Sequence, residues 1–414
     1  MRRFALLASL STVCTTGAVA QTRVFTHADT LRGSNTPERA WWDATFYDLH
    51  VRVNPADSSI VGANGITYKV LRPASVMQID LQPPLDVDSM VQDGKHVVFR
   101  RDGNAFFATL TAPQRTGDRN TIWVYYRGAY RPRGAAAPGR GGGPFHWDVD
   151  TTGKPWIATS DEGPGASTWW PLKDIPADEP DSQRIAITVP DPLIDVSNGR
   201  LRSTVHHPDH TTTYEWFVAD PINNYDVAVN AGSYAHWQDT LQGEAGPLTL
   251  DFWPLAYHLD TARVQFQQAK TMLACFEDWF GPYPWYKDGY KLVETGHLGM
   301  EHQSAIAYGN HYKNGYLGRD LSHTGVGLTW DFIIVHESAH EWWGNSLTDQ
   351  DVADMWIHES FANYAENLYV ECLSGKAKGA EYVIGTRKNI RNDEPILGIF
   401  GVNHEGSGDV YYKG

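Results

Sequence analysis

Apolar and polar residues alternate along short stretches in the first half of the chain. Residues 49–54 place an apolar side chain at every second position, and residues 185–189 repeat the pattern. Successive side chains of a β-strand point to opposite faces, so this alternation predicts strands with one buried face. The pairs Asp93-Gly94 and Asp102-Gly103 lie between such stretches and predict turns. We therefore expect an all-β region from Phe46 to about Tyr234.

The pattern changes to helical spacing after about residue 235. Residues 261–280 carry apolar side chains three and four positions apart and stop before Gly281-Pro282, which predicts one amphipathic helix. Residues 329–343 and 354–373 predict two more helices. Because 414 residues exceed what one hydrophobic core usually organises, we expect two domains, residues 21–238 with β-sheets and residues 239–414 with helices and strands.

The first twenty residues have the features of a secretory signal peptide. A basic Met1-Arg2-Arg3 precedes a short apolar stretch, and Ala18-Val19-Ala20 provides small residues for cleavage. A membrane-spanning helix is the alternative, but serine and threonine interrupt a stretch already shorter than the ~20 apolar residues needed. We expect residues 1–20 to be removed and the protein to be secreted or periplasmic, without a stable membrane anchor.

Charge, cysteine content and one biased segment add to the prediction of ligands and structure. The formal net charge is −15, which argues against binding to nucleic acid and favours cationic ligands such as peptide amino termini. Cys275 and Cys372 would remain after cleavage, and they could form a disulfide or be buried thiols. Residues 131–143 are rich in Gly, Ala, Arg and Pro and predict a flexible surface loop.

A metal-binding motif lies in the predicted helix at residues 329–343. His336 and His340 are four positions apart, so both imidazoles project from one helix face and can reach one ion. Glu337 is rotated by about 100° from His336, which places it beside a metal-bound water rather than among the ligands. We expect Glu337 to be a general base.

Glu359 supplies a third ligand from the next predicted helix. Two imidazoles, one carboxylate and an open position favour a single catalytic zinc ion over a closed structural site, which would use a fourth protein ligand. Iron and manganese are less suited to this donor set. Glu366, seven residues later on the same helix face, is either the partner of a ligand histidine or a solvated helix residue.

Longer motifs surround these residues. The segments that carry them are WGN at 343–345, WIHESFANY at 356–364, LGMEH at 298–302, SDE at 160–162, VSNG at 196–199, FGPYP at 280–284 and YYKG at 411–414. Together with HESAH at 336–340 they resemble the gluzincin zinc aminopeptidases, the family of aminopeptidase N and the leukotriene hydrolase. Leu298 and His302 depart from the glycine and asparagine that the family has at these positions.

The resemblance implies roles for residues beyond the zinc ligands. Glu301 and Glu162 would bind the α-ammonium group of the substrate, and Gly299 and Met300 would bind the substrate's backbone. Tyr411 would donate a hydrogen bond to the oxyanion. A fixed carboxylate beside zinc would select peptides with a free amino terminus, because it sets the distance between that terminus and the metal.

The resemblance also implies an α+β multidomain fold. A saddle-like all-β domain would be followed by a thermolysin-like α/β catalytic domain, and the helical domain that follows YxKG in the family would be missing after Gly414. The implied activity is zinc-dependent aminopeptidase. The alternatives are a thermolysin-like endopeptidase, an epoxide hydrolase like one family member, and a non-catalytic peptide-binding scaffold.

Overall fold

The computed structural model describes residues 26–130, 144–392 and 395–401. Three features predicted from the sequence lie outside these residues: the signal peptide at residues 1–20, the loop at 131–143, and Tyr411.

The largest sheet has eight strands in the order β13-β14-β11-β1-β2-β8-β4-β5. Their bounds are β1 Trp42–Asn54, β2 Ser59–Val70, β4 Asp86–Gln92, β5 Lys95–His96, β8 Arg119–Ala129, β11 Ser182–Pro190, β13 Arg200–His207 and β14 Thr211–Val218. β1 pairs antiparallel with β2 and parallel with β11. Along β1, Leu49, Val51 and Val53 are buried and the residues between them are more exposed, so the predicted alternation is confirmed.

Two smaller sheets complete the β-rich region. One contains β3 Val76–Asp80, β7 Ala105–Thr109 and β6 Val98–Asp102, and the other contains β12 Ile194–Val196, β15 Asn230–Gly232, β10 Pro155–Thr159 and β9 Phe145–Val149. Asp93 and Gly94 connect β4 to β5, and both have positive φ, as a two-residue hairpin turn requires.

The second half of the chain combines a five-stranded sheet with helices. The sheet order is β16-β17-β18-β20-β19, with bounds β16 Trp237–Gly243, β17 Gly246–Trp253, β18 Tyr290–Glu294, β19 Gly299–Met300 and β20 Ile306–Tyr308. The helices are α2 Leu259–Gln265, α3 Gln268–Phe280, α4 Phe332–Ala339, α5 Trp356–Ser374 and α6 Lys376–Thr386. Short 3₁₀ turns, including η2 (Asn224–Asp226), connect the larger elements.

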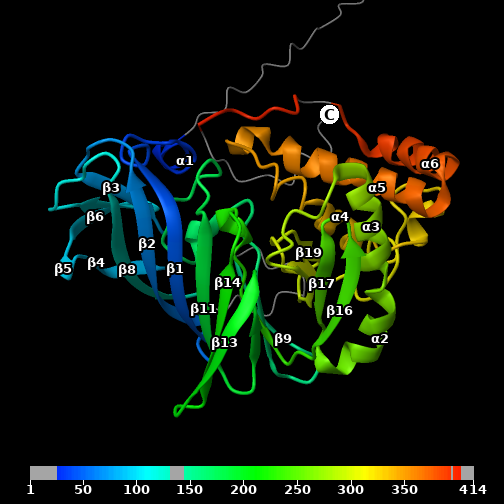
Figure 1. The fold of residues 1–414 in the computed structure, drawn as a ribbon, viewed down its shortest axis with the longest axis horizontal. Coiled ribbons are helices and arrows are strands. Elements are labelled where there is room, and N and C mark those ends of the chain that lie inside the picture. The colour runs from blue at the N-terminus through cyan, green and yellow to red at the C-terminus, as the bar shows by residue number, and fades with distance from the viewer. Residues whose placement is uncertain (1–25, 131–143, 393–394, 402–414) are drawn as a thin grey trace, which may run out of the picture.

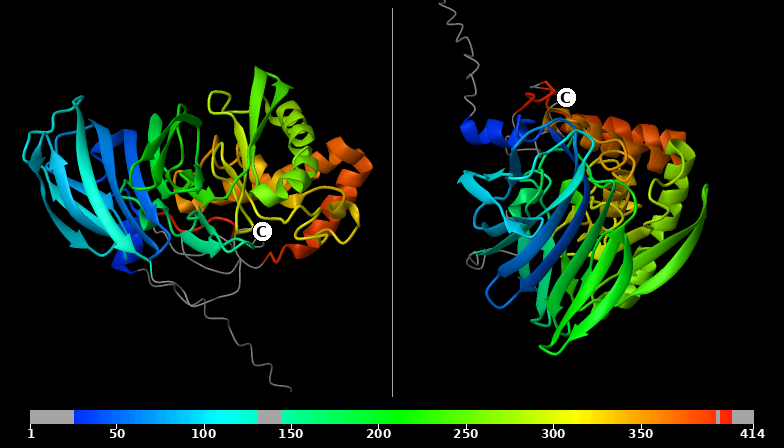
Figure 2. Two further views of the ribbon diagram at one scale, coloured as in Figure 1. Left: turned by 90° about the horizontal axis from the view of Figure 1, so that it is seen from below. Right: turned by 60° about the vertical axis from the view of Figure 1, so that its left-hand side comes forward.

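The predicted order, a β-rich domain followed by an α/β domain, is confirmed. Figures 1 and 2 show the sheets of the first half on one side and the helices α2 to α6 on the other. One hydrophobic core fills the β-rich region, and a second lies between the five-stranded sheet and the helices. The boundary near residue 238 stays a prediction, because Tyr234 and Leu255 on either side of it share the first core. In the described part of the chain, no helix is long and apolar enough to span a membrane.

The single helix predicted for residues 261–280 is wrong. α2 ends at Gln265 and α3 begins at Gln268, because Phe266 turns inward and is fully buried against Phe252 and Tyr308. The Gln268 side chain accepts a hydrogen bond from the Asp331 backbone N–H, which holds the start of α3 beside α4.

The helix predicted for residues 329–343 is also shorter than expected. Asp331 has extended backbone angles, and its carboxylate accepts the N–H groups of Ile333 and Ile334, so α4 starts at Phe332. The helix ends at Ala339, and the chain turns at Gly344, where φ is 120°. The helix predicted for residues 354–373 agrees closely with α5.

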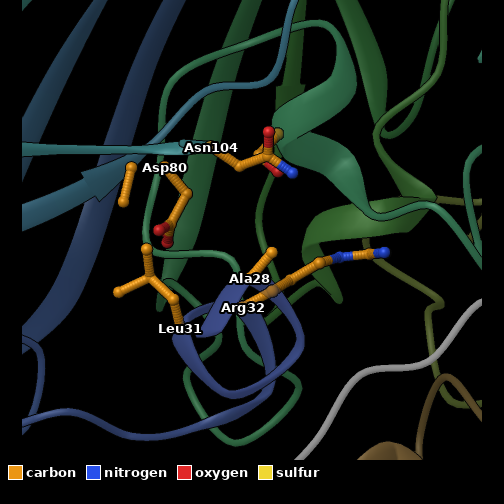
Figure 3. Close-up of a pocket in the computed structure, with 7 residues that line it drawn as sticks. Ala28, Leu31, Arg32, Asp80 and Asn104 are labelled. Atoms are coloured by element: carbon orange, nitrogen blue, oxygen red, sulfur yellow. The ribbon is translucent and has the colours of Figure 1, made fainter. Parts of the chain in front are cut away.

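An N-terminal helix, α1 (His27–Gly33), packs on the β-rich region. Leu31 is buried with Ala105 and Phe107, while Arg32 extends in another direction from the helix across a small cavity (Figure 3). The Arg32 guanidinium donates a 2.5 Å hydrogen bond to the Gly163 carbonyl. α1 therefore holds the loop that carries Glu162.

A disulfide joins Cys275 on α3 to Cys372 on α5. Of the two alternatives left open by the sequence, pairing is therefore confirmed. The bridge closes a loop with a sequence separation of 97 residues, which contains α4 and most of α5. It restricts the unfolded chain and ties α5 to the second core.

Replacing both cysteines with serine should lower the free energy of unfolding by about 2–4 kcal/mol, because the crosslink restricts the unfolded state. Urea unfolding of the two proteins with and without dithiothreitol measures this. The reductant should bring the wild type to the stability of the Cys275→Ser/Cys372→Ser variant and leave the variant unchanged. Equal stability of the two proteins without reductant would contradict the prediction.

Candidate active site

The two motif histidines lie at the end of α4. Every side chain of this helix is buried, and His336 and His340 are one turn apart. Their Nε2 atoms are 3.3 Å from each other. The predicted pairing of two imidazoles on one helix face is therefore present.

The helix α5 brings Glu359 to these imidazoles. Its Oε2 lies 3.4 Å from His336 Nε2 and 3.7 Å from His340 Nε2. The three atoms form a nearly equilateral triangle, and all three side chains are buried. Contacts also join Trp330 to Tyr369 at the other end of α4, so the two helices run antiparallel.

The outer ring nitrogens of both histidines are held by acceptors. His340 Nδ1 lies 2.9 Å from the Trp343 carbonyl, and a carbonyl can only accept, so Nδ1 carries the proton and Nε2 presents its lone pair inward. His336 Nδ1 lies 2.8 Å from Glu366 Oε1, and Tyr382 donates to the other oxygen of Glu366 at 2.8 Å. Of the two interpretations of Glu366, the partner of a histidine is the one that the structure supports.

Glu337 lies at the side of this triangle. Its carboxylate belongs with Glu301 and His340 to a second group of closely spaced ligand atoms. Burial raises the pKa of Glu337 to about 8, although neighbouring His336 opposes the shift. A Cβ on Gly299 would lie 2.5 Å from Glu337 Oε1, so only glycine allows this close approach.

Gly299 and Met300 form β19, which lies at the edge of the five-stranded sheet. Among the described residues, β19 pairs antiparallel with β20 on one side only, so its other side can pair with an extended peptide. Glu301 follows directly and is buried, and burial raises its pKa to about 7, with Glu359 adding to the shift. Asn345 holds this position by donating to the Glu301 carbonyl at 2.8 Å.

Glu162 reaches the same place from the loop after β10. Ligand atoms of Glu162, Glu301 and His358 all lie within 4.8 Å of one another. Glu162 Oε1 is buried and has no hydrogen-bond partner among the described residues. Burial raises the pKa of Glu162 well above its usual value, and the carboxylates of Glu301 and Glu359 raise it further. Carboxylates gathered in this way are stabilised by a bound cation.

The two residues that depart from the family motif differ in burial. Leu298 is half-buried and packs against the second core, and His302 is fully buried. Burial lowers the pKa of His302 to about 3, so its imidazole is neutral at physiological pH. Tyr411 lies outside the described residues.

Two residues at the site were not found from the sequence. Tyr225 and His358 both contact the carboxylate cluster, and the Tyr225 hydroxyl donates to Glu301 Oε1 at 3.2 Å. His358 directly precedes Glu359 in the motif at 356–364, and this position could have indicated a residue of the site. The sequence contains no such indication for Tyr225, because its position depends on how η2 folds against the helices.

Comparisons with known proteins show sequence similarity to peptidases. Residues 264–395 match the model of the Peptidase family M1 domain. Aminopeptidase N of Lactobacillus delbrueckii subsp. lactis is 24% identical over 344 residues, which cover 79% of this chain and 37% of that protein. Aminopeptidase N of Streptomyces lividans is 30% identical over 158 residues, which cover 37% of this chain and 18% of that protein.

Solved structures share the fold. A variant of the M1 zinc metallopeptidase from Deinococcus radiodurans superposes with a TM-score of 0.71 at 21% identity, covering 91% of this chain and 81% of that one. The chain spans less than two fifths of the length of the curated relatives named above. The expected resemblance to the gluzincin aminopeptidases is thus confirmed, and the matching segment 264–395 holds His336, Glu337, His340 and Glu359.

Proposed function

We propose that this chain is a zinc-dependent aminopeptidase, which hydrolyses the first peptide bond of substrates with a free amino terminus. The observation that carries the proposal is the position of Glu301 beside the triangle of His336, His340 and Glu359, with Glu162 next to Glu301. A peptide bond can be placed at the triangle while its amino terminus binds the carboxylates.

The triangle fits one zinc ion. Zinc bonds of about 2.0–2.2 Å in a tetrahedral arrangement place ligand atoms about 3.3–3.6 Å apart. The observed separations of 3.3, 3.4 and 3.7 Å are close to these values. Two imidazoles with one carboxylate are also the donor set of catalytic zinc sites in which a fourth position stays open. His336, His340 and Glu359 would hold the ion.

Zinc bound by these residues would polarise the substrate carbonyl and acidify water. Glu337 is proposed as the general base that takes a proton from the attacking water and then gives it to the leaving amine. Tyr411 is proposed to donate a hydrogen bond to the oxyanion. Gly299 keeps the Glu337 carboxylate close to the edge of β19, along which the substrate backbone would pair.

Recognition of the amino terminus would exclude internal peptide bonds. An ammonium group bound by Glu301 and Glu162 fixes the distance from the first residue to the metal. A thermolysin-like endopeptidase needs no such pair of buried carboxylates, and a scaffold without activity needs no base at Glu337. The aminopeptidase therefore explains more of the site than either of these two alternatives.

The disulfide supports the proposed export from the cytoplasm. Disulfides persist in oxidising compartments, and here Cys275, which is buried in the second core, is bridged to Cys372 on α5. We propose that the protein acts in the periplasm or outside the cell.

Aminoacyl-anilide turnover that a chelator abolishes and zinc restores is the direct test of the proposed aminopeptidase function.

Glu366→Gln should weaken zinc binding by about 10- to 100-fold, because the charged acceptor that orients His336 is lost. Competition with a chromogenic chelator measures the zinc dissociation constant without any substrate. Glu371→Gln on the same helix is the control, since that carboxylate lies 3.8 Å from Lys376 and away from the histidines. Equal affinity in the Glu366 and Glu371 variants would count against the proposed zinc site.

Glu337→Gln should retain one zinc per chain and lose at least about 10²-fold in kcat, because the amide has the same shape but cannot accept the proton. Metal analysis and aminoacyl-anilide hydrolysis measure the two properties. Glu381→Gln, at an exposed helix position paired with Lys378, should behave as the wild type. Near-normal turnover by the Glu337 variant would rule out its role as base.

Glu301→Ala should lower kcat/KM for a free-amine dipeptide by about 10- to 100-fold, because a charge-assisted contact to the ammonium is removed. The N-acetylated dipeptide lacks that charge and should be affected much less. Zinc content should be unchanged. A similar decrease for both substrates would show that Glu301 does not recognise the amino terminus.

A further inference from the structure

We propose that Tyr225 is a positioning residue that orients the carboxylate of Glu301 towards the substrate ammonium, and that His358 holds the Tyr225 hydroxyl in its donating orientation. This inference rests on the proposed aminopeptidase function. Under this proposal, a residue of the β-rich region orients a carboxylate that belongs to the second half of the chain.

The contacts form a chain of hydrogen bonds. Tyr225 Oη lies 3.2 Å from Glu301 Oε1 and 3.4 Å from His358 Nδ1. The rings of Tyr225 and His358 are stacked, with centroids 6.2 Å apart and planes inclined by 24°. The phenol is therefore fixed from one side by the imidazole while it reaches the carboxylate on the other.

The direction of the chain follows from Asp349. Its backbone N–H donates to His358 Nε2 at 3.2 Å, so in the neutral imidazole the proton is on Nδ1. A protonated imidazole also carries a proton on Nδ1, and Asp349 Oδ1 lies 3.3 Å from Nε2 to accept from that form. In both states His358 donates to Tyr225, so the single phenolic proton of Tyr225 goes to Glu301.

The backbone around Tyr225 is anchored to both halves of the molecule. Asn223 donates to the Gly344 carbonyl at 2.6 Å and accepts from Thr348 at 3.1 Å. Asn224 donates to the carbonyls of Lys173 and Asp178. Burial and the nearby Glu301 carboxylate raise the pKa of Tyr225 well above its usual value, so the phenol keeps its proton. The donor therefore has a fixed place and a fixed protonation state.

One hydrogen bond from Tyr225 restricts the rotation of Glu301 without using its capacity to bind an ammonium group. An ionised carboxylate offers about four acceptor sites on two oxygens. Glu162 Oε1, which has no partner among the described residues, completes the acceptor set around the amine. Tyr225 thus acts on amine recognition through Glu301, without a bond to the substrate.

Two hydroxamates that differ only by the α-amino group isolate this effect. Both bind the zinc-loaded 414-residue chain through the metal, and only the amino acid hydroxamate presents an ammonium group. Calorimetry gives the ratio of their dissociation constants without turnover. In Tyr225→Phe we expect this ratio to fall by about 3- to 10-fold, while zinc content and the affinity of the hydroxamate without the amine stay at wild-type values.

Tyr214→Phe is the matched control, because it removes a hydroxyl of β14 that donates to the Leu193 carbonyl, outside the carboxylate cluster. A double-mutant cycle adds the decisive comparison: in a Glu301→Ala background, Tyr225→Phe should cause no further change in the ratio. A merely structural defect would weaken both hydroxamates in either background.

The outcomes separate this inference from the proposed function. A wild-type chain that binds both hydroxamates equally, or neither, would overturn the aminopeptidase proposal and the inference with it. A wild-type preference for the amino compound that is unchanged in Tyr225→Phe would overturn the inference alone. A loss in Tyr225→Phe that persists with Glu301→Ala would also overturn it, because Tyr225 would then not act through Glu301.

Discussion

The antiparallel packing of α5 against α4 is the constraint on which the rest of the site depends. It places a buried carboxylate within 3.7 Å of two imidazole nitrogens, one of which must present its lone pair inward. Such an arrangement is costly in the protein interior unless a cation binds at its centre. The chain thus uses folding energy to prepare a site whose charges a metal ion balances.

Several interactions fix α5 in the register that this site needs. The disulfide holds the C-terminal end of the helix, Tyr382 and His336 hold Glu366 near its middle, and Trp330 packs on Tyr369 between them. A slip of one residue would rotate Glu359 by about 100° around the helix axis and remove it from the triangle. These contacts therefore make the metal site rigid without adding any ligand.

The sequence was sufficient for features with local geometry. His336 and His340 were predicted because a four-residue spacing fixes two side chains on one helix face, and the strand at residues 49–54 followed from alternation alone. The break at Phe266 and the start of α4 at Asp331 were missed because burial of one ring and one capping carboxylate overrode the apolar periodicity. Tyr225 was missed for a related reason, since its neighbours in the sequence say nothing of Glu301.

The proposed selectivity for an amino terminus is a property of how two regions pack. The metal ligands all come from α4 and α5, whereas Glu162 and Tyr225 come from the β-rich region. Hydrogen bonds between the regions, from Asn198 to the Gln303 carbonyl at 2.7 Å and from Asn223 to the Gly344 carbonyl, set the distance between the carboxylates and the metal site. Because that distance defines which peptide bond reaches the metal, a small shift between the regions would change the position of cleavage more readily than it would change the chemistry.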